Sequence, residues 1–192
     1  MIEKIIVAFF LFISYLPNNQ QVRVIHIKPL GHVNSTEVMF IKTSIEEFYH
    51  FKCLIDTADE LTPDLLAKSG TRYDAPSILK KYKTPKNILL ITNKDITHKD
   101  TQRKIDEYGI IGLGLLHGTV CVVSTYRIKK NVSDIKFHDR LKKVSLHEVG
   151  HNLGLNHCDN NIHCLMNDAK GTAKQIDIEK VWLCQKCVRI LK

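Results

Sequence analysis

Apolar residues in the first half of the chain form short runs that alternate with helical repeats. The short runs predict strands over 22–27, 53–55 and 87–92. Apolar residues at helical spacing, with charged residues at the intervening positions, predict helices over 36–51 and 75–82. Strands and helices are therefore expected to follow one another in this half.

The second half begins with a predicted hairpin and continues into a long helix. The apolar segments 110–115 and 119–125 flank three turn residues, as two adjacent antiparallel strands would. Apolar positions at helical spacing then run from 137 to 153. Because alternating strands and helices precede a hairpin, the sequence predicts a mixed sheet packed on helices, of the α/β or α+β class.

Composition narrows the class of protein. The chain has 192 residues, which fits one domain, and we place that domain at 21–192. Hydrophobic residues make up 44% and charged residues 25%, which excludes a disordered or collagen-like chain. No apolar run reaches the roughly 20 residues of a membrane-spanning helix, so a multi-span transporter is excluded. The net charge of +8 would attract nucleic acid, anionic lipid or acidic peptides, and alone it selects none of them.

Residues 1–20 carry a different pattern. Lys4 precedes the apolar run 5–13, and a polar break follows at 17–19, which is the outline of a secretory signal. A buried strand or an uncleaved single anchor is the alternative. Glu3 offsets the charge of Lys4, no small-x-small cleavage site follows, and the run is short for a full span. On this outline we expect export or envelope anchoring rather than a cytoplasmic location, with any membrane association through this segment.

A metal-binding pattern lies at the end of the last predicted helix. His147 and His151 are four residues apart, so they project from the same helix face and can bind one metal ion. Glu148 lies beside them, where its carboxylate can take a proton from a metal-bound water. Gly154 is placed to end the helix, and His157 can return as a third ligand, leaving the fourth zinc position open. The alternative is three solvated or core histidines that never meet.

Six cysteines form a second pattern. Four of them lie in the last 35 residues, as two short-spaced pairs about 20 residues apart, which is typical of a closed four-sulfur zinc site. These four are Cys158, Cys164, Cys184 and Cys187. Two disulfides are the alternative, and an exported chain would favour them. Cys53 and Cys121 stand alone in apolar strands, where we expect buried thiols.

The combined pattern resembles one family. The stretch 147–187 reads His-Glu-x-x-His-x-x-Gly-x-x-His-Cys, then Cys-x-Met, then Cys-x-x-Cys. This string resembles the archaemetzincins, a branch of the metzincin-type zinc metalloproteases. One departure is a spacer of five residues between Cys158 and Cys164, where the family has four. The longer spacer brings His163 next to Cys164, so an exchange of ligands at the cysteine site stays open.

The resemblance implies a role for each matching residue. His147, His151 and His157 would hold a catalytic zinc, and Glu148 would act as general base and acid. Met166 would form the floor beneath that zinc. A second, structural zinc would be held by Cys158, Cys164, Cys184 and Cys187. The implied fold is a compact metzincin-like domain, with a mixed twisted sheet packed on helices, an active-site helix and a small, cysteine-rich, zinc-bound C-terminal part.

These observations predict a monomeric zinc-dependent peptidase with two zinc ions per chain and a peptide or protein as substrate. An extended substrate could pair with an edge strand of the hairpin at 110–125. A non-catalytic zinc module that binds nucleic acid through its positive charge is one alternative, and a degenerate protease is another. The basic residues are dispersed and no aromatic-interleaved basic stripe occurs, so no specific nucleic-acid partner is expected. The choice between endopeptidase and aminopeptidase stays open.

Overall fold

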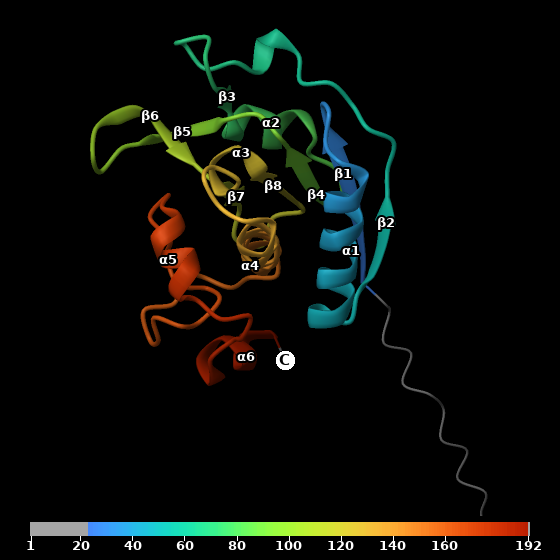
Figure 1. Cartoon of the computed structure of the whole chain (residues 1–192), viewed down its shortest axis with the longest axis vertical. Coiled ribbons are helices and arrows are strands. Elements are labelled where there is room, and N and C mark those ends of the chain that lie inside the picture. Colours follow the sequence, from blue (N-terminus) through green and yellow to red (C-terminus); the bar gives the residue numbers. More distant parts are fainter. Residues whose placement is uncertain (1–22, 192) are drawn as a thin grey trace, which may run out of the picture.

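The computed structural model describes residues 23–191 and places the strands of that range in two sheets (Figure 1). The strands are β1 (Val24–Leu30), β2 (Lys52–Ile55), β3 (Tyr73–Asp74), β4 (Asn87–Thr92), β5 (Ile96–Asp100), β6 (Ile105–Ile110), β7 (Gly112–Gly114) and β8 (Val120–Ser124). The helices are α1 (Ser35–Tyr49), a 3₁₀ turn (Pro63–Leu65), α2 (Ala75–Lys81), α3 (Thr125–Ile128), α4 (Asp134–Asn152), α5 (Ala173–Ile178) and α6 (Gln185–Leu191).

The larger sheet has the strand order β2-β1-β4-β8-β7. Its first four strands run parallel, and β7 pairs antiparallel with β8 at one edge. The sheet is therefore mixed, and the predicted hairpin and fold class are both confirmed. β7 is the last strand of this order and packs beside α4, and the candidate site lies along its outer edge.

Helices cover both faces of the larger sheet, and β4 shows why. Successive side chains of a strand point to opposite faces, so a strand buried on both sides is apolar throughout. Leu89 and Ile91 point into a core shared with α1 and α4. Ile88 and Leu90 point into a second core shared with α2. The continuous apolar run of β4 thus reflects its central position between two helical layers.

The smaller sheet, in the order β3-β5-β6, is the part of the fold that the hydrophobic pattern did not predict. β5 and β6 form an antiparallel hairpin, and the residues of β6 are mostly exposed or half-buried. Because neither face of β6 is fully buried, polar residues occupy it and no apolar run marks it. Figure 1 shows this hairpin projecting from the larger sheet on the same side of the molecule as α5.

The long helix α4 is buried over its second half, where the sequence changes from charged to apolar. Its N-cap is Ser133, whose hydroxyl accepts a hydrogen bond from the Lys136 N–H at 3.4 Å. The buried residues Leu141 and Leu146 anchor the helix against the core shared with α1. The helix is therefore rigidly placed at the residues that carry the candidate site.

The predicted signal or anchor at 1–20 lies outside the residues that the structure describes. Within residues 23–191, no helix has both the length and the apolar character needed to cross a membrane.

Asp95 connects the smaller sheet to the rest of the molecule, and we predict that its charge stabilises the fold. Its carboxylate accepts hydrogen bonds from Arg127 Nε at 2.7 Å and Arg72 Nε at 3.1 Å. Asp95→Asn leaves two partly buried guanidinium groups short of a counter-charge, so the free energy of unfolding should fall by about 1–3 kcal/mol.

Urea denaturation measures this change in the free energy of unfolding, with Asp106→Asn as the control. Asp106 and Lys99 form an exposed pair, for which we expect a change below about 1 kcal/mol. Equal effects of the two substitutions would contradict the prediction.

Candidate active site and metal centres

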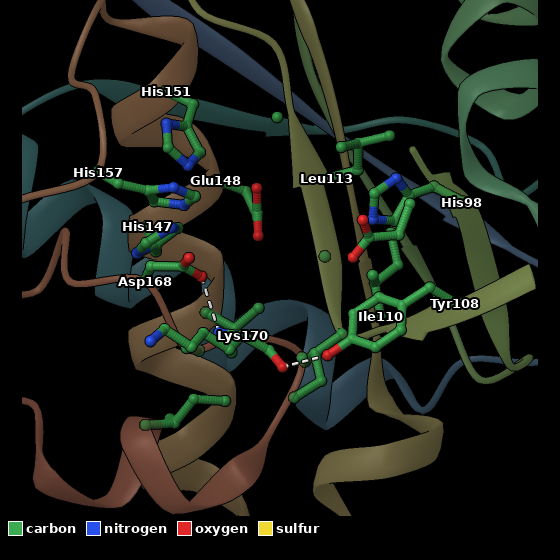
Figure 2. A pocket seen from close by; sticks show the side chains of 18 of the residues that line it. His98, Tyr108, Ile110, Leu113, His147, Glu148, His151, His157, Asp168 and Lys170 are labelled. Atoms are coloured by element: carbon green, nitrogen blue, oxygen red, sulfur yellow. Dashed lines mark hydrogen bonds between the residues drawn. The ribbon is translucent and has the colours of Figure 1, made fainter. Parts of the chain in front are cut away.

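Three histidine side chains converge at the end of α4 (Figure 2). His147 and His151 lie one turn apart on the helix, and His157 follows it in the chain. The ring centroids of His147 and His151 are 4.7 Å apart, and His157 is 5.4 Å and 4.8 Å from them. One ring nitrogen of each lies within 4.8 Å of the others, so the three side chains could hold one metal ion. The histidines that the sequence singled out therefore do meet.

A turn at Gly154 allows His157 to return to the helix end. Gly154 has a φ of +96°, a conformation that side chains other than glycine rarely adopt. A Cβ at this position would also lie 2.4 Å from the ring of His117. Beyond the turn, the Leu155 N–H donates to the carbonyl of Gly150 at 2.9 Å and holds the returning chain against the helix.

Two of the imidazoles are oriented by backbone carbonyls. The Nδ1 atoms of His147 and His151 lie 2.7 Å from the carbonyl oxygens of Leu165 and Leu155, respectively. An Nδ1–H donated to a carbonyl leaves Nε2 as the free lone pair, which is the arrangement that metal-binding histidines commonly use. Burial lowers the pKa of His147 to about 3 and that of His151 to about 4. Both rings are therefore neutral at physiological pH, as a metal ligand must be.

Glu148 lies on the cleft side of α4, directly under the edge strand β7. Burial raises the pKa of its carboxyl group to about 8, and a hydrogen bond from the Gly114 N–H acts in the opposite direction. A Cβ added at Gly112 would lie 2.3 Å from Glu148 Oε1, and one at Gly114 would lie 2.6 Å from the Glu148 carbonyl oxygen. The glycines of β7 thus let the strand approach the helix closely enough to cover this carboxyl group.

The three histidines and Glu148 open into a cleft of about 570 Å³. α4 forms one wall, and the strands β6 and β7 form the wall opposite, as Figure 2 shows. The segment 168–171 lies across one end, where the Tyr108 hydroxyl donates to the carbonyl of Lys170. The cleft has the size of a small-ligand or peptide site, and polar groups line it both on α4 and on the hairpin of β5 and β6.

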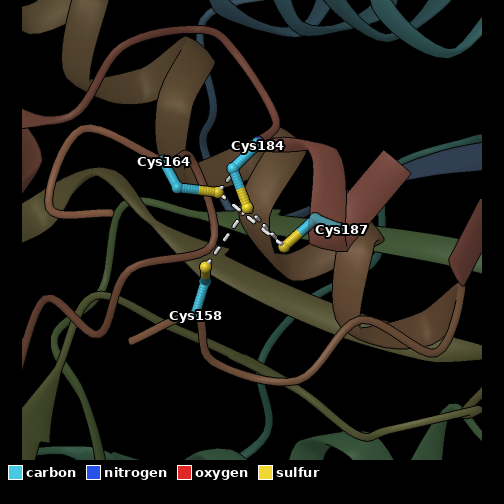
Figure 3. Close-up of side chains that lie close together, drawn as sticks. All are labelled: Cys158, Cys164, Cys184 and Cys187. Carbon is cyan, nitrogen blue, oxygen red and sulfur yellow. Dashed lines mark hydrogen bonds between the residues drawn. The ribbon is translucent and has the colours of Figure 1, made fainter. Parts of the chain in front are cut away.

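Four cysteine sulfurs form a separate cluster (Figure 3). The Sγ–Sγ distance is 3.6 Å for Cys158 and Cys184, and 3.8 Å for Cys187 with both Cys164 and Cys184. A tetrahedral zinc with Zn–S bonds of about 2.3 Å would set its sulfurs about 3.8 Å apart, whereas a disulfide needs about 2.05 Å. The four side chains therefore have the spacing of a zinc tetrathiolate and not that of two disulfides.

The thiols of this cluster differ in how readily they ionise. Burial raises the pKa of Cys164 and that of Cys187. Burial also opposes ionisation of Cys184, but hydrogen bonds from the Cys187 backbone and from neighbouring side chains outweigh it and lower the pKa of Cys184 to about 6. One thiolate is therefore available near neutral pH to begin metal binding. Cys53 and Cys121 are free buried thiols, as the sequence predicted.

The longer spacer between Cys158 and Cys164 is taken up by a turn. The Asn161 side chain accepts a hydrogen bond from the His163 N–H at 2.8 Å, and the Asn161 carbonyl accepts one from the Cys164 N–H at 3.0 Å. The exposed His163 ring lies 3.0 Å from the carbonyl of Ile178 and is not one of the four clustered side chains. The turn therefore accommodates the extra residue without moving Cys164 away from the other three cysteines of the cluster.

Met166 packs against the turn of α4 that carries the histidines. It is fully buried, and a Cβ added at Gly150 would lie 2.6 Å from its Sδ. Its carbonyl accepts a hydrogen bond from the Cys158 N–H at 2.7 Å. Met166 thus contacts the helix turn that carries the histidines and also the segment that carries the cysteines.

Several cleft residues were not predicted from the sequence. They include His98, Tyr108, Asp168, Lys170, Ile176 and Glu179. These residues come from a polar hairpin and from the segment after Met166, and none of them belongs to a recognisable motif. Only the backbone arrangement brings them to the cleft.

A helix with two histidines four apart, a third histidine after a glycine turn and a glutamate under an edge strand define a zinc-dependent metallopeptidase. Comparison with known proteins agrees. The sequence model of Peptidase family M54 matches residues 74–192, and the chain belongs to this family. The prediction of a zinc metallopeptidase is thereby confirmed at the level of the family.

The relatives of this chain are archaemetzincins. The archaemetzincin of Halobacterium salinarum is 28% identical over 177 residues, which cover 86% of this chain and 97% of the relative. That of Haloarcula marismortui is 40% identical over 106 residues, which cover 50% and 59%. The crystal structure of the Archaeoglobus fulgidus archaemetzincin, complexed with malonate, superposes with a TM-score of 0.76 at 27% identity and covers 87% of this chain and 99% of that one. The resemblance found in the sequence therefore extends over most of the described fold.

Because β7 covers Glu148 so closely, we predict that a methyl group at Gly112 disturbs that carboxyl group. Gly112→Ala places a Cβ 2.3 Å from Glu148 Oε1, so the carboxyl must move. A displacement of about 1 Å at a reacting group can lower kcat/KM by about 100-fold, and we expect a loss of that order in peptide cleavage. Metal content should stay as in the wild type. Gly70→Ala is the control: its φ of +71° strains a side chain and costs some stability, but nothing lies within 4 Å of the added methyl and Gly70 does not line the cleft, so kcat/KM of the folded protein should not change. Unchanged kcat/KM in Gly112→Ala would mean that the carboxyl is not needed there.

Proposed function

We propose that this chain hydrolyses peptide bonds with a zinc ion held by His147, His151 and His157, and with Glu148 as general base and acid. The observation that carries the proposal is the convergence of three imidazoles in a cleft beside a buried carboxyl group. Three protein ligands leave one tetrahedral position open, which is typical of catalytic rather than structural zinc. Three histidine nitrogens with one open position therefore fit a catalytic zinc ion.

Glu148 has the properties that the proton transfers require. A zinc ion in such a site supplies a Lewis acid, which polarises a carbonyl group and acidifies water. Glu148 takes the proton of the attacking water and then delivers it to the leaving amine. Burial raises the pKa of this carboxyl group to about 8, so that, once ionised, it is a stronger base than an exposed glutamate and holds the proton for the leaving amine. A zinc ion bound beside it would favour the ionised form that takes the first proton. The Gly114 N–H holds the carboxylate in place for both steps.

The substrate lies in extended form along β7 in this proposal. β7 ends the strand order of the larger sheet, so its outer N–H and C=O groups, apart from the Gly114 N–H that donates to Glu148, can pair with a peptide. A peptide that adds to a sheet edge gains backbone hydrogen bonds independent of its side chains. β7 also lies directly over Glu148, so a peptide on this edge passes the proposed zinc site. Peptides and unfolded protein segments are the substrates that this arrangement favours.

We also propose that Cys158, Cys164, Cys184 and Cys187 bind a second, structural zinc. The sulfur spacing supports it, and four protein ligands leave no position for water. Cys158 directly follows His157 in the chain, so this zinc would fix the position of the third imidazole. The second zinc would thus stabilise the histidine site and take no part in the hydrolysis itself.

Replacing Glu148 by glutamine tests the proposed base. Glu148→Gln keeps the size of the side chain but cannot accept the proton, so kcat should fall by about 100-fold or more while zinc content is unchanged. Cleavage of a peptide library, with zinc measured by mass spectrometry, gives both values. Glu60→Gln, at an exposed carboxyl outside the cleft, is the matched control and should cleave normally.

Removal of the metal gives the complementary result. Wild-type cleavage should be lost in a chelator and return on addition of zinc, because the proposed chemistry needs a Lewis acid. Normal turnover in Glu148→Gln, or chelator-resistant cleavage, would contradict the proposal. Salt-dependent binding of DNA or RNA without any hydrolysis would favour the nucleic-acid alternative instead.

A further inference from the structure

Glu179 is a buried acidic residue in the cleft that the proposed chemistry does not use. It directly follows α5 and lines the cleft together with Val144 and Ile176. Its exposed fraction is 4%, and within residues 23–191 no hydrogen-bond partner is found for its Oε1. A buried polar atom without a partner is rare in folded proteins and calls for an explanation at a binding cleft.

The cations near Glu179 already have acidic partners. Lys143 Nζ lies 2.7 Å from Asp139 Oδ2 and donates to the carbonyl of Ile176 at 3.1 Å. Arg140 binds both carboxylate oxygens of Asp177. Among the ion pairs of the described residues, none includes Glu179. The carboxyl group of Glu179 is therefore not simply the counter-charge of a neighbouring lysine or arginine.

The electrostatic environment agrees with a missing cationic partner. Burial raises the pKa of Glu179 to about 8, and the charge of Asp168 adds to this, although the charge of Lys143 and a hydrogen bond from Gln175 act to lower it. Burial disfavours the carboxylate, and a cation that enters beside it restores the charged form. The other acid at this end of the cleft, Asp168, differs, because its Oδ1 accepts a hydrogen bond from the Lys170 N–H at 2.7 Å.

The direction of β7 shows which part of a substrate reaches Glu179. Added Cβ atoms at Gly112 and Gly114 would meet the Glu148 carboxyl group and the His151 side chain, respectively, so β7 runs in the same direction as α4. A peptide that pairs antiparallel with β7 runs the opposite way, and its C-terminal half passes toward the Val144 end of the cleft. Val144 precedes the first histidine by one helical turn. The side chain that follows the scissile bond is therefore the one directed to Glu179.

We propose that Glu179 makes this peptidase selective for lysine or arginine immediately after the scissile bond. The apolar stem of such a side chain packs against Val144 and Ile176, and its charged end donates to Glu179 Oε1. Long basic side chains combine an apolar stem with a charged end in this way. Hydrogen bonds between ionised groups are among the strongest in proteins, which makes this contact a source of specificity. The inference rests on the proposed function, because it needs a peptide held along β7.

A pair of peptides that differ only in the ammonium group tests the proposal. One peptide has lysine after the scissile bond, and the other has norleucine, which keeps the stem without the charge. The wild type should cleave the lysine peptide with a kcat/KM at least about tenfold higher. Glu179→Gln should bring the ratio close to one, whereas the control Glu60→Gln should keep it. If Glu179→Gln does not fold, Glu179→Asp serves instead and should keep a preference for lysine.

A binding measurement separates this inference from the proposed function. Two hydroxamate ligands, one with a lysine and one with a norleucine side chain, are titrated into the zinc-loaded protein by calorimetry. A Kd ratio of about tenfold in favour of lysine that Glu179→Gln removes would support the inference, even if neither peptide is cleaved. Equal Kd values in the wild type, or cleavage of both peptides at equal rates, would overturn it. Loss of the preference in Asp168→Asn but not in Glu179→Gln would also overturn it.

Discussion

The turn at Gly154 is the constraint on which the rest of the candidate site depends. A straight continuation of α4 would carry His157 away from His147 and His151, and only a sharp return brings three rings to one point. The left-handed conformation of Gly154 makes that return, and the space beside it is too small for a Cβ. Leu155, one residue later, gives its carbonyl to His151 and its N–H to Gly150, so the turn also orients a ring.

The two groups of candidate ligands form one unit through the segment that follows the turn. Cys158 is adjacent to His157, and its N–H donates to the carbonyl of Met166. Leu165, between Cys164 and Met166, supplies the carbonyl that orients His147. A metal ion held by the sulfurs would therefore stiffen the backbone that positions two of the three imidazoles. Four of the buried core residues of the small C-terminal part are the cysteines themselves, so a metal ion that links their sulfurs would add to its stability.

The sequence predicted those parts of the molecule whose pattern has a direct physical cause. β4 is apolar throughout because helices cover both of its sides, and α1 and α4 repeat at helical spacing because one side of each is buried. The hairpin of β5 and β6 was missed because exposed strands have no such pattern. Glu179 was missed for a related reason: a lone acid in a polar segment carries no signal until the fold buries it. The histidine and cysteine groups could be found since metal binding fixes residue type and spacing together.

The zinc content of the intact chain, purified without chelator or histidine tag, tests the central claim most directly. The account predicts two zinc ions per chain, together with six titratable thiols after denaturation in a chelator. One zinc with two free thiols would mean that the four C-terminal cysteines form disulfides and that only the histidines bind metal. The absence of zinc from the purified chain would contradict the claim that the three histidines bind a zinc ion. Retention of both ions in histidine variants would contradict it as well.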